Sequence, residues 1–192
     1  MTLTRARLRS TGLSLTAAIA IGLLVQGCGS DAPAPPTAAP STSTDTAVLL
    51  DRALGASAAG DTAAAQRDFE ALRAQDPANK LAPYNLGVLA QQAGDDTTAA
   101  ARYDETLTID PAYEPALYNL AILTTKRGDV EGAVDLYERA IRADPGDANA
   151  HYNLGLLLRR LGDQTRGDAA IKKAIALDPT LERPSASASP TR

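Results

Sequence analysis

The side chains that most often perform catalysis or bind metals are scarce in this chain of 192 residues. It contains one histidine, His151, and one cysteine, Cys28. A catalytic base needs a partner that orients it, and a zinc site needs several Cys or His ligands. Serine and threonine are frequent, but no base is placed to activate them as nucleophiles. We therefore expect no enzyme, no metal site and no cofactor, and a structural role for His151.

Phosphate-binding patterns are missing from the sequence as well. It contains neither G-x-x-x-x-G-K-[ST] nor G-x-G-x-x-G, the glycine-rich loops that hold nucleotides. The net charge is −4, whereas nucleic-acid binding needs clustered cationic charge. The pair Asp95-Asp96 suggests a cation site, but helix capping already explains Asp95. We expect no nucleic-acid partner.

The single cysteine closes an N-terminal segment with three zones. A start with three arginines precedes an apolar run over residues 13–25, which ends in Val25-Gln26-Gly27-Cys28. The run is shorter than the ~20 residues of a membrane span and has the length of a signal-peptide core. The arrangement resembles the bacterial lipoprotein signal, in which a lipid transferase and then a peptidase act at the cysteine. The alternative is an unlipidated signal anchor in which Cys28 occurs by chance.

The resemblance to the lipoprotein signal implies where this protein is found. Residues 1–27 would be removed, and Cys28 would carry a thioether-linked diacylglyceryl group, with or without an N-acyl chain. The protein would then be extracytoplasmic and anchored to a bacterial membrane. Residues 28–45 would form the lipidated end and a disordered Pro/Ser/Thr-rich linker, because residues 29–45 have no large apolar side chain to bury. The tail, 182–192, is expected to be disordered for the same reason.

From residue 46 the sequence repeats with a period of 34 residues. Asp-Pro pairs begin at 76, 110, 144 and 178, Gly-Asp pairs at 60, 94, 128 and 162, and Tyr-Asn-Leu at 84, 118 and 152. A period of 34 with helical segments resembles the tetratricopeptide repeat (TPR) family. The resemblance implies an all-α solenoid of about four helix–turn–helix repeats, 46–79, 80–113, 114–147 and 148–181. The first repeat is degenerate, since Arg52 stands where the others have leucine.

The local pattern agrees with two helices per repeat. Residues 80–93 place Leu86, Leu89 and Ala90 on one helical face. Gly94 suits the left-handed position after a helix, and Asp95 is placed to cap the next one. Small residues recur where the paired helices would cross, with bulky residues beside them. The small residues are Gly87, Ala121 and Gly155 on first helices and Ala65, Ala99, Ala133 and Gly167 on second helices; the bulky ones are Phe69, Tyr103, Tyr137 and Ile171.

Each first helix carries a second stripe of side chains beside its core stripe. In TPR proteins the first helices form the concave wall, so the resemblance implies that this stripe, here named the Tyr/Asn face, binds a peptide. A repeated asparagine offers a donor and an acceptor to each peptide unit of an extended chain. The alternative is that these side chains bond only between adjacent helices. The predicted residues are Tyr84, Asn85, Val88, Gln91, Tyr118, Asn119, Ile122, Lys126, Tyr152, Asn153, Leu156 and Arg159.

These expectations combine into a membrane-anchored adaptor of the cell envelope. It would bind an extended peptide or a helix of another envelope protein, and it would hold the membrane through its lipid anchor. The alternative is a homodimer formed through an uncapped last helix, 164–177, which is expected to expose Ile171, Ala174 and Ile175. Positive charge concentrates in the last repeat. These basic residues could bind an acidic segment of a partner, could bind anionic lipid, or could form a solvated helix face.

Overall fold

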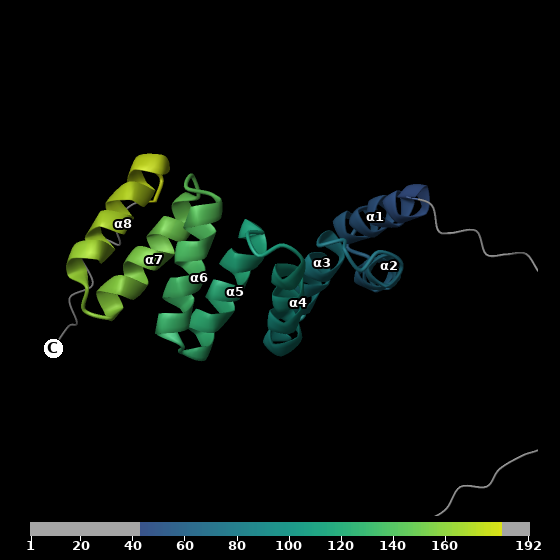
Figure 1. The fold of residues 1–192 in the computed structure, drawn as a ribbon, viewed down its shortest axis with the longest axis horizontal. Coiled ribbons are helices and arrows are strands. Elements are labelled where there is room, and N and C mark those ends of the chain that lie inside the picture. Colours follow the sequence, from purple (N-terminus) through teal and green to yellow (C-terminus); the bar gives the residue numbers. More distant parts are fainter. Residues whose placement is uncertain (1–42, 182–192) are drawn as a thin grey trace, which may run out of the picture. The chain divides into compact units, whose positions relative to one another are not determined.

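The described part of the chain is a series of helices. The computed structural model describes residues 43–181, which form eight α-helices and no strand, and Figure 1 shows them following one another in chain order. The helices are α1 (Ser43–Ala58), α2 (Thr62–Gln75), α3 (Leu81–Gln92), α4 (Asp96–Ile109), α5 (Glu114–Arg127), α6 (Val130–Ala143), α7 (Ala148–Arg160) and α8 (Gln164–Leu177).

The predictions about the signal peptide, Cys28, most of the linker and the tail fall on residues 1–42 and 182–192, outside the described residues. Within residues 43–181, no helix is both long enough and apolar enough to cross a membrane.

The helices pack as successive hairpins. Within each repeat the two helices are paired, α1 with α2, α3 with α4, α5 with α6 and α7 with α8, and each hairpin contacts the next through α2–α3, α4–α5 and α6–α7. This is the all-α solenoid that the 34-residue period predicts. The last second helix has the predicted bounds, 164–177.

Aspartate and glycine set the ends of these helices, as the sequence predicts. Gly94, after α3, has a φ of +79°, which only glycine adopts without strain. The carboxylate of Asp95 then accepts a hydrogen bond from the backbone N–H of Thr98 at 3.0 Å and caps α4. The same pairing of glycine and capping aspartate precedes α2, α6 and α8, at Gly60-Asp61, Gly128-Asp129 and Gly162-Asp163.

The predicted contact of small with bulky residues brings each pair of helices together. A Cβ added to Gly87 in α3 would lie 2.7 Å from the ring of Tyr103 in α4, which is fully buried. One added to Gly155 in α7 would lie 2.6 Å from Ile171 in α8. Such distances are too short for a side chain, so these glycines are required for the close approach of the helices.

The degenerate first repeat replaces an apolar contact with a polar one. Arg52 in α1 forms two hydrogen bonds to the carboxylate of Asp68 in α2, at 2.5 and 2.6 Å, and its side chain is 60% exposed. The leucines at the equivalent positions, Leu86, Leu120 and Leu154, are all buried. The α1–α2 hairpin therefore depends more on Ala53, Ala65 and Phe69, which are fully buried.

The expectation that α8 exposes an apolar stripe is wrong for two of its three residues. Ile171 is 5% exposed and Ala174 is fully buried, while Ile175 is half-buried. The reason is that Gly155 and Gly167 let α7 and α8 approach until the Cβ position of one glycine lies 2.8 Å from the carbonyl oxygen of the other. Ile171 therefore packs against α7. Self-association through α8 stays a prediction, without these two residues to support it.

Candidate peptide-binding face

Two tyrosines of the Tyr/Asn face, Tyr84 and Tyr118, pack on aromatic side chains of their own repeat. The ring of Tyr84 in α3 meets Tyr113 edge-on with centroids 5.2 Å apart and lies 6.0 Å from Tyr103. Tyr118 in α5 meets Tyr137 edge-on at 5.8 Å. Burial raises the pKa of the Tyr84 and Tyr118 hydroxyls. These hydroxyls are therefore neutral at physiological pH and able to donate or accept a hydrogen bond.

The asparagines connect one repeat with the next. The side-chain amide of Asn119 in α5 donates to the hydroxyl of Tyr84 at 3.5 Å, and that of Asn153 in α7 donates to Tyr118 at 3.2 Å. For Asn85, the residue equivalent to these tyrosines is Leu50, which has no hydroxyl. Asn85 donates instead to the backbone carbonyl of Leu81 in its own helix. The repeated asparagines therefore form hydrogen bonds between adjacent repeats, which is one of the two interpretations that the sequence allows. Asn119 and Asn153 are half-buried.

A groove of about 360 Å³ adjoins this network. Three predicted residues line it, Val88, Gln91 and Asn119, together with Gln92 and Tyr103. The hydroxyl of Tyr103 donates to the side-chain oxygen of Gln91 at 2.7 Å. The sequence assigned Tyr103 only to the helix crossing, and its hydroxyl end at the groove was missed. Exposed Gln92 lies on the predicted stripe but was not among the residues predicted to bind.

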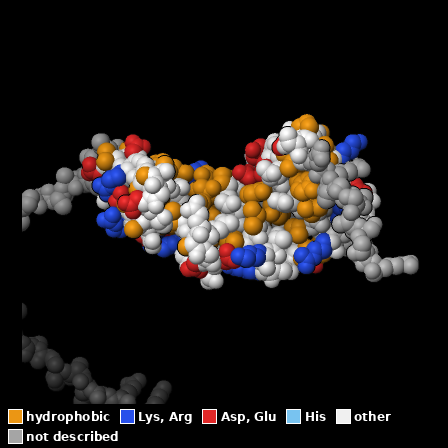
Figure 2. Space-filling model, turned by 180° about the vertical axis from the view of Figure 1, so that it is seen from behind, with side chains coloured by type: hydrophobic (Ala, Val, Ile, Leu, Met, Phe, Trp, Pro, Cys, Tyr) orange, Lys and Arg blue, Asp and Glu red, His pale blue; other side chains and the backbone are white. Residues whose placement is uncertain are grey.

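Hydrophobic side chains gather over the middle of the face seen in Figure 2, with acidic side chains beside them. On the Tyr/Asn face itself, Val88 and Ile122 are half-buried, and Leu156 is 38% exposed. Tyr152 is half-buried as well. An extended peptide bound here would meet aliphatic side chains next to polar amides.

The two basic residues predicted for this face hold intramolecular partners. The ammonium of Lys126 pairs with Asp96 in α4, and the guanidinium of Arg159 lies 3.7 Å from the carboxylate of Asp168 in α8. Arg166, also in the last repeat, lies 2.6 Å from Glu138. These pairs offset part of the positive charge at the C-terminal end of the helices.

Three acidic residues influence one another electrostatically near the tyrosines, and the sequence did not predict this group. Glu114 begins α5, Asp147 caps α7, and Asp144 ends α6. Burial, followed by the charge of Asp147, a hydrogen bond to it and the charge of Asp144, raises the pKa of Glu114 to about 7. The negative charges of Glu114 and Asp147 also act on the Tyr118 hydroxyl, which places them at the Tyr/Asn face.

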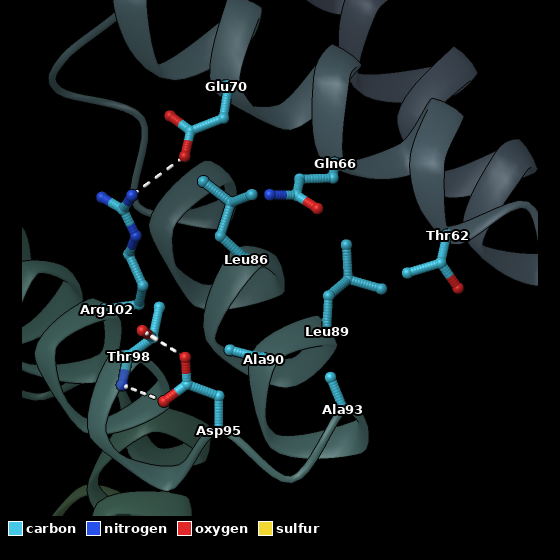
Figure 3. A pocket seen from close by; sticks show the side chains of 10 residues that line it. All are labelled: Thr62, Gln66, Glu70, Leu86, Leu89, Ala90, Ala93, Asp95, Thr98 and Arg102. Atoms are coloured by element: carbon cyan, nitrogen blue, oxygen red, sulfur yellow. Dashed lines mark hydrogen bonds and ion pairs between the residues drawn. The ribbon is translucent and has the colours of Figure 1, made fainter.

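A second groove, of about 210 Å³, lies between α2, α3 and α4 (Figure 3). Leucines and alanines of α3 line it from one side, and polar residues of α2 and α4 from the others. At one end Arg102 donates to Glu70 at 2.9 Å, and nearby Thr98 donates to Asp95 at 2.7 Å. The lining residues are Thr62, Gln66, Glu70, Leu86, Leu89, Ala90, Ala93, Asp95, Thr98 and Arg102.

His151 takes part in a local contact of α7. Its Nε2 atom lies 3.2 Å from the backbone carbonyl oxygen of Pro145. Among residues 43–181, no group of three Cys, His, Asp or Glu side chains is arranged to hold a metal ion.

Comparison with known proteins places the repeats in a family. A family model described as Tetratricopeptide repeat matches residues 50–114, one described as TPR repeat matches 123–162, and a second Tetratricopeptide repeat model matches 148–181. A search of curated proteins gave no match.

Several solved structures share the fold. A MamA protein has 24% identity and a TM-score of 0.63, covering 71% of this chain and 74% of its own. A tetratricopeptide repeat protein of Parabacteroides merdae has 23% identity and a TM-score of 0.62, covering 70% and 54%. YrrB, described as a TPR protein with an unusual peptide-binding site, has 18% identity and a TM-score of 0.58, covering 71% of each chain. At these identities the likeness concerns the fold alone.

Proposed function

Because the chain belongs to the tetratricopeptide repeat family, whose members are generally interaction scaffolds, we propose that it is an adaptor that binds an extended peptide segment on its Tyr/Asn face. The single observation that carries this proposal is the groove beside Val88, Gln91 and Asn119. There, the side-chain amides of Gln91, Gln92 and half-buried Asn119 lie beside the aliphatic side chain of Val88. These groups suit a peptide backbone, which offers both donors and acceptors.

The adaptor is further proposed to act in the cell envelope of a bacterium, held to a membrane by lipid on Cys28. The support is the sequence Val25-Gln26-Gly27-Cys28 behind an apolar run of signal-peptide length. Two acyl chains anchor a protein stably, whereas one chain binds only reversibly. The partner would then be another envelope protein.

The peptide site is tested by photocrosslinking in the native membrane. A photoreactive amino acid is placed at Gln92 in the groove, and at exposed Lys172 on α8 as the control position. We expect a defined crosslinked partner from position 92 and none from position 172. The double variant Asn119→Ala with Asn153→Ala should weaken the crosslink while the protein stays folded. Equal crosslinking from both positions would refute binding at this face.

A further inference from the structure

The junction between the first two repeats is closed by a ring of four charged side chains. Glu70 and Arg73 of α2 face Arg102 and Glu105 of α4, and each arginine pairs with both glutamates. The guanidinium of Arg73 lies 2.9 Å from the carboxylate of Glu70 and 3.1 Å from that of Glu105, and the guanidinium of Arg102 lies 2.9 Å from each. Among residues 43–181, no other four side chains form such a ring. It is named the ionic clasp below.

Polar side chains stand between α2 and α4 where the later repeats have apolar ones. Counting 34 residues onward, Arg102 becomes Leu136, and Gln66, which lines the same groove, becomes Ala100. Leu136 and Ala100 are both buried, whereas Gln66 is exposed. The second helices of the first two repeats are therefore joined by charge, at positions where the next pair of second helices buries apolar side chains.

The second groove, of about 210 Å³, lies at this junction. Figure 3 shows the ion pair of Arg102 with Glu70 at one end of it. The leucines and alanines that line the groove come from α3, whereas the lining residues of α2 and α4 are polar or charged. Along the groove, α2 and α4 can therefore change their separation without breaking an apolar contact with each other.

The first two repeats also meet through α2 and α3, and there the contact is apolar. Ala65 and Phe69 of α2 belong to the same buried cluster as Leu86 and Leu89 of α3, and Phe69 is fully buried. Separating these side chains would expose apolar surface to water, which is unfavourable. The contact between α2 and α3 is therefore the more persistent one, and movement at the junction falls to α2 and α4.

The ionic clasp is open to dissolved ions. Its four side chains are 25–37% exposed. The Debye length falls from about 30 Å at 0.01 M salt to about 3 Å at 1 M, which approaches the distances between the charges of the clasp. High salt therefore weakens the attraction between α2 and α4, whereas an apolar contact has no charge to screen.

We propose that the first junction is a salt-sensitive hinge, in which the α1–α2 hairpin turns about the apolar contact of α2 with α3 when the ionic clasp between α2 and α4 opens. This movement widens the second groove. The hinge is independent of the proposed function, because the residues that line the peptide groove belong to the second and third repeats alone. A change of ionic strength therefore moves the first repeat and leaves the peptide groove as it is.

The test measures distances between spin labels on second helices by double electron–electron resonance. It uses the complete chain in detergent with Cys28→Ser, so that only introduced cysteines are labelled. One pair of labels, at Ala63 in α2 and Glu131 in α6, spans the ionic clasp. The control pair, at Thr97 in α4 and Thr165 in α8, occupies the equivalent positions 34 residues onward and does not span it. All four labelled residues are exposed.

Both pairs are measured at about 0.01 M and about 1 M NaCl. We expect the population of longer Ala63–Glu131 distances to rise about fivefold at the higher salt, and the Thr97–Thr165 distances to stay unchanged. An Ala63–Glu131 distance that is the same at both salt concentrations would overturn the hinge. Equal widening of both label pairs would overturn it as well, because the loosening would then be general.

Two double variants with unchanged net charge test the clasp itself. Glu70→Gln with Arg102→Gln leaves only the pair of Arg73 with Glu105, and should give the longer Ala63–Glu131 distances at both salt concentrations. The matched control, Glu138→Gln with Arg166→Gln, removes an ion pair between α6 and α8 and should keep the salt response of the parent chain. A salt response that survives the first variant, or is lost in the second, would show that the clasp does not control the movement.

Helical content is measured for every variant first. If Glu70→Gln with Arg102→Gln loses helix, Arg73→Gln with Glu105→Gln takes its place, since it leaves only the pair of Arg102 with Glu70. Crosslinking from Gln92 is a separate measurement, so the hinge can fail while the proposed function stands, and the reverse.

Discussion

The side-chain amide of Asn153 donates a hydrogen bond to the hydroxyl of Tyr118, 35 residues earlier in the chain, at 3.2 Å. The bond joins the first helices of two successive repeats, α7 and α5. Because both residues also belong to the Tyr/Asn face, the same side chains contribute to the packing of repeats and to the candidate site. Their two roles can be separated by measurement.

The hydrogen bond itself should contribute little to stability. Tyr118→Phe and Asn153→Ala are each expected to lower the free energy of unfolding by about 0.5–1.5 kcal/mol, since a neutral hydrogen bond gains little over the bonds that water provides. Urea denaturation of both single variants and the double variant gives the coupling between the two side chains. Loss of the folded state in Asn153→Ala would make the asparagines structural elements, contrary to a binding role.

The stability of the chain should depend on pH through Glu114. Its pKa in the folded state is raised to about 7 from the ordinary 4.5, by burial first and then by Asp147 and Asp144. The folded chain therefore keeps a proton in this window that the unfolded chain has released, and the contribution of Glu114 to stability falls as the pH rises.

Glu114→Gln removes that titration. We expect the variant to be more stable than the unchanged protein above about pH 7, by about 1 kcal/mol after solvent screening of the half-exposed carboxyl is allowed for. The difference should vanish below about pH 4, where the carboxyl is protonated in both states. Urea midpoints measured across this range provide the check. A constant difference at all pH values would show that Glu114 is not the titrating group.

The two helical glycines Gly87 and Gly55 should respond in opposite ways to alanine. At Gly87 the added Cβ would lie 2.7 Å from the buried Tyr103 ring, whereas at Gly55 nothing lies within 4 Å. Gly87→Ala should destabilise the protein by about 1–3 kcal/mol through overpacking. Gly55→Ala should stabilise it by about 0.5–1 kcal/mol, because alanine favours a helix. Thermal unfolding of both variants tests the contrast, which a similar shift in both would contradict.

The lipid anchor has a direct test in the intact bacterium. Cys28→Ala removes the thiol that would receive the diacylglyceryl group, so the protein should stop incorporating labelled palmitate. Because the peptidase acts after the lipid transferase, the variant should also keep residues 1–27 and migrate as the longer precursor. Metabolic labelling and the apparent mass of the protein measure the two effects. Ser30→Ala, two residues away, serves as the matched control and should behave like the unchanged protein. If the unchanged protein takes up no label and has the same mass as Cys28→Ala, it carries an uncleaved signal anchor and the lipid anchor is wrong.

Much of the fold could be predicted because every repeat ends and begins its helices through the same short-range interactions. Gly94 and Asp95 end one helix and begin the next through φ preference and capping, which act within a few residues. The contact between Gly87 and Tyr103 recurs at the same register and could be read from the period. The burial of Ile171 was missed because it depends on how closely α8 approaches Gly155, a tertiary distance.

The candidate site could be predicted only in part. The Tyr/Asn face follows from one helical stripe, but its acidic neighbours come from three different elements, the start of α5, the end of α6 and the cap of α7. A stripe on a single helix cannot include them. A signal was nevertheless present, since comparing Lys80, Asp110 and Tyr113 with the residues 34 positions onward shows a basic residue exchanged for an acid.

The polar replacement in the first repeat has a mechanical consequence. Residue 42 leads directly into α1, so any pull that reaches the helices from the N-terminal side of the chain acts on α1 first. There, Arg52, whose side chain is 60% exposed, pairs with Asp68 at the place where later repeats bury leucine. We therefore expect α1 to be the first helix to detach under tension, and the length of chain that it releases delays the load on the hairpins that follow.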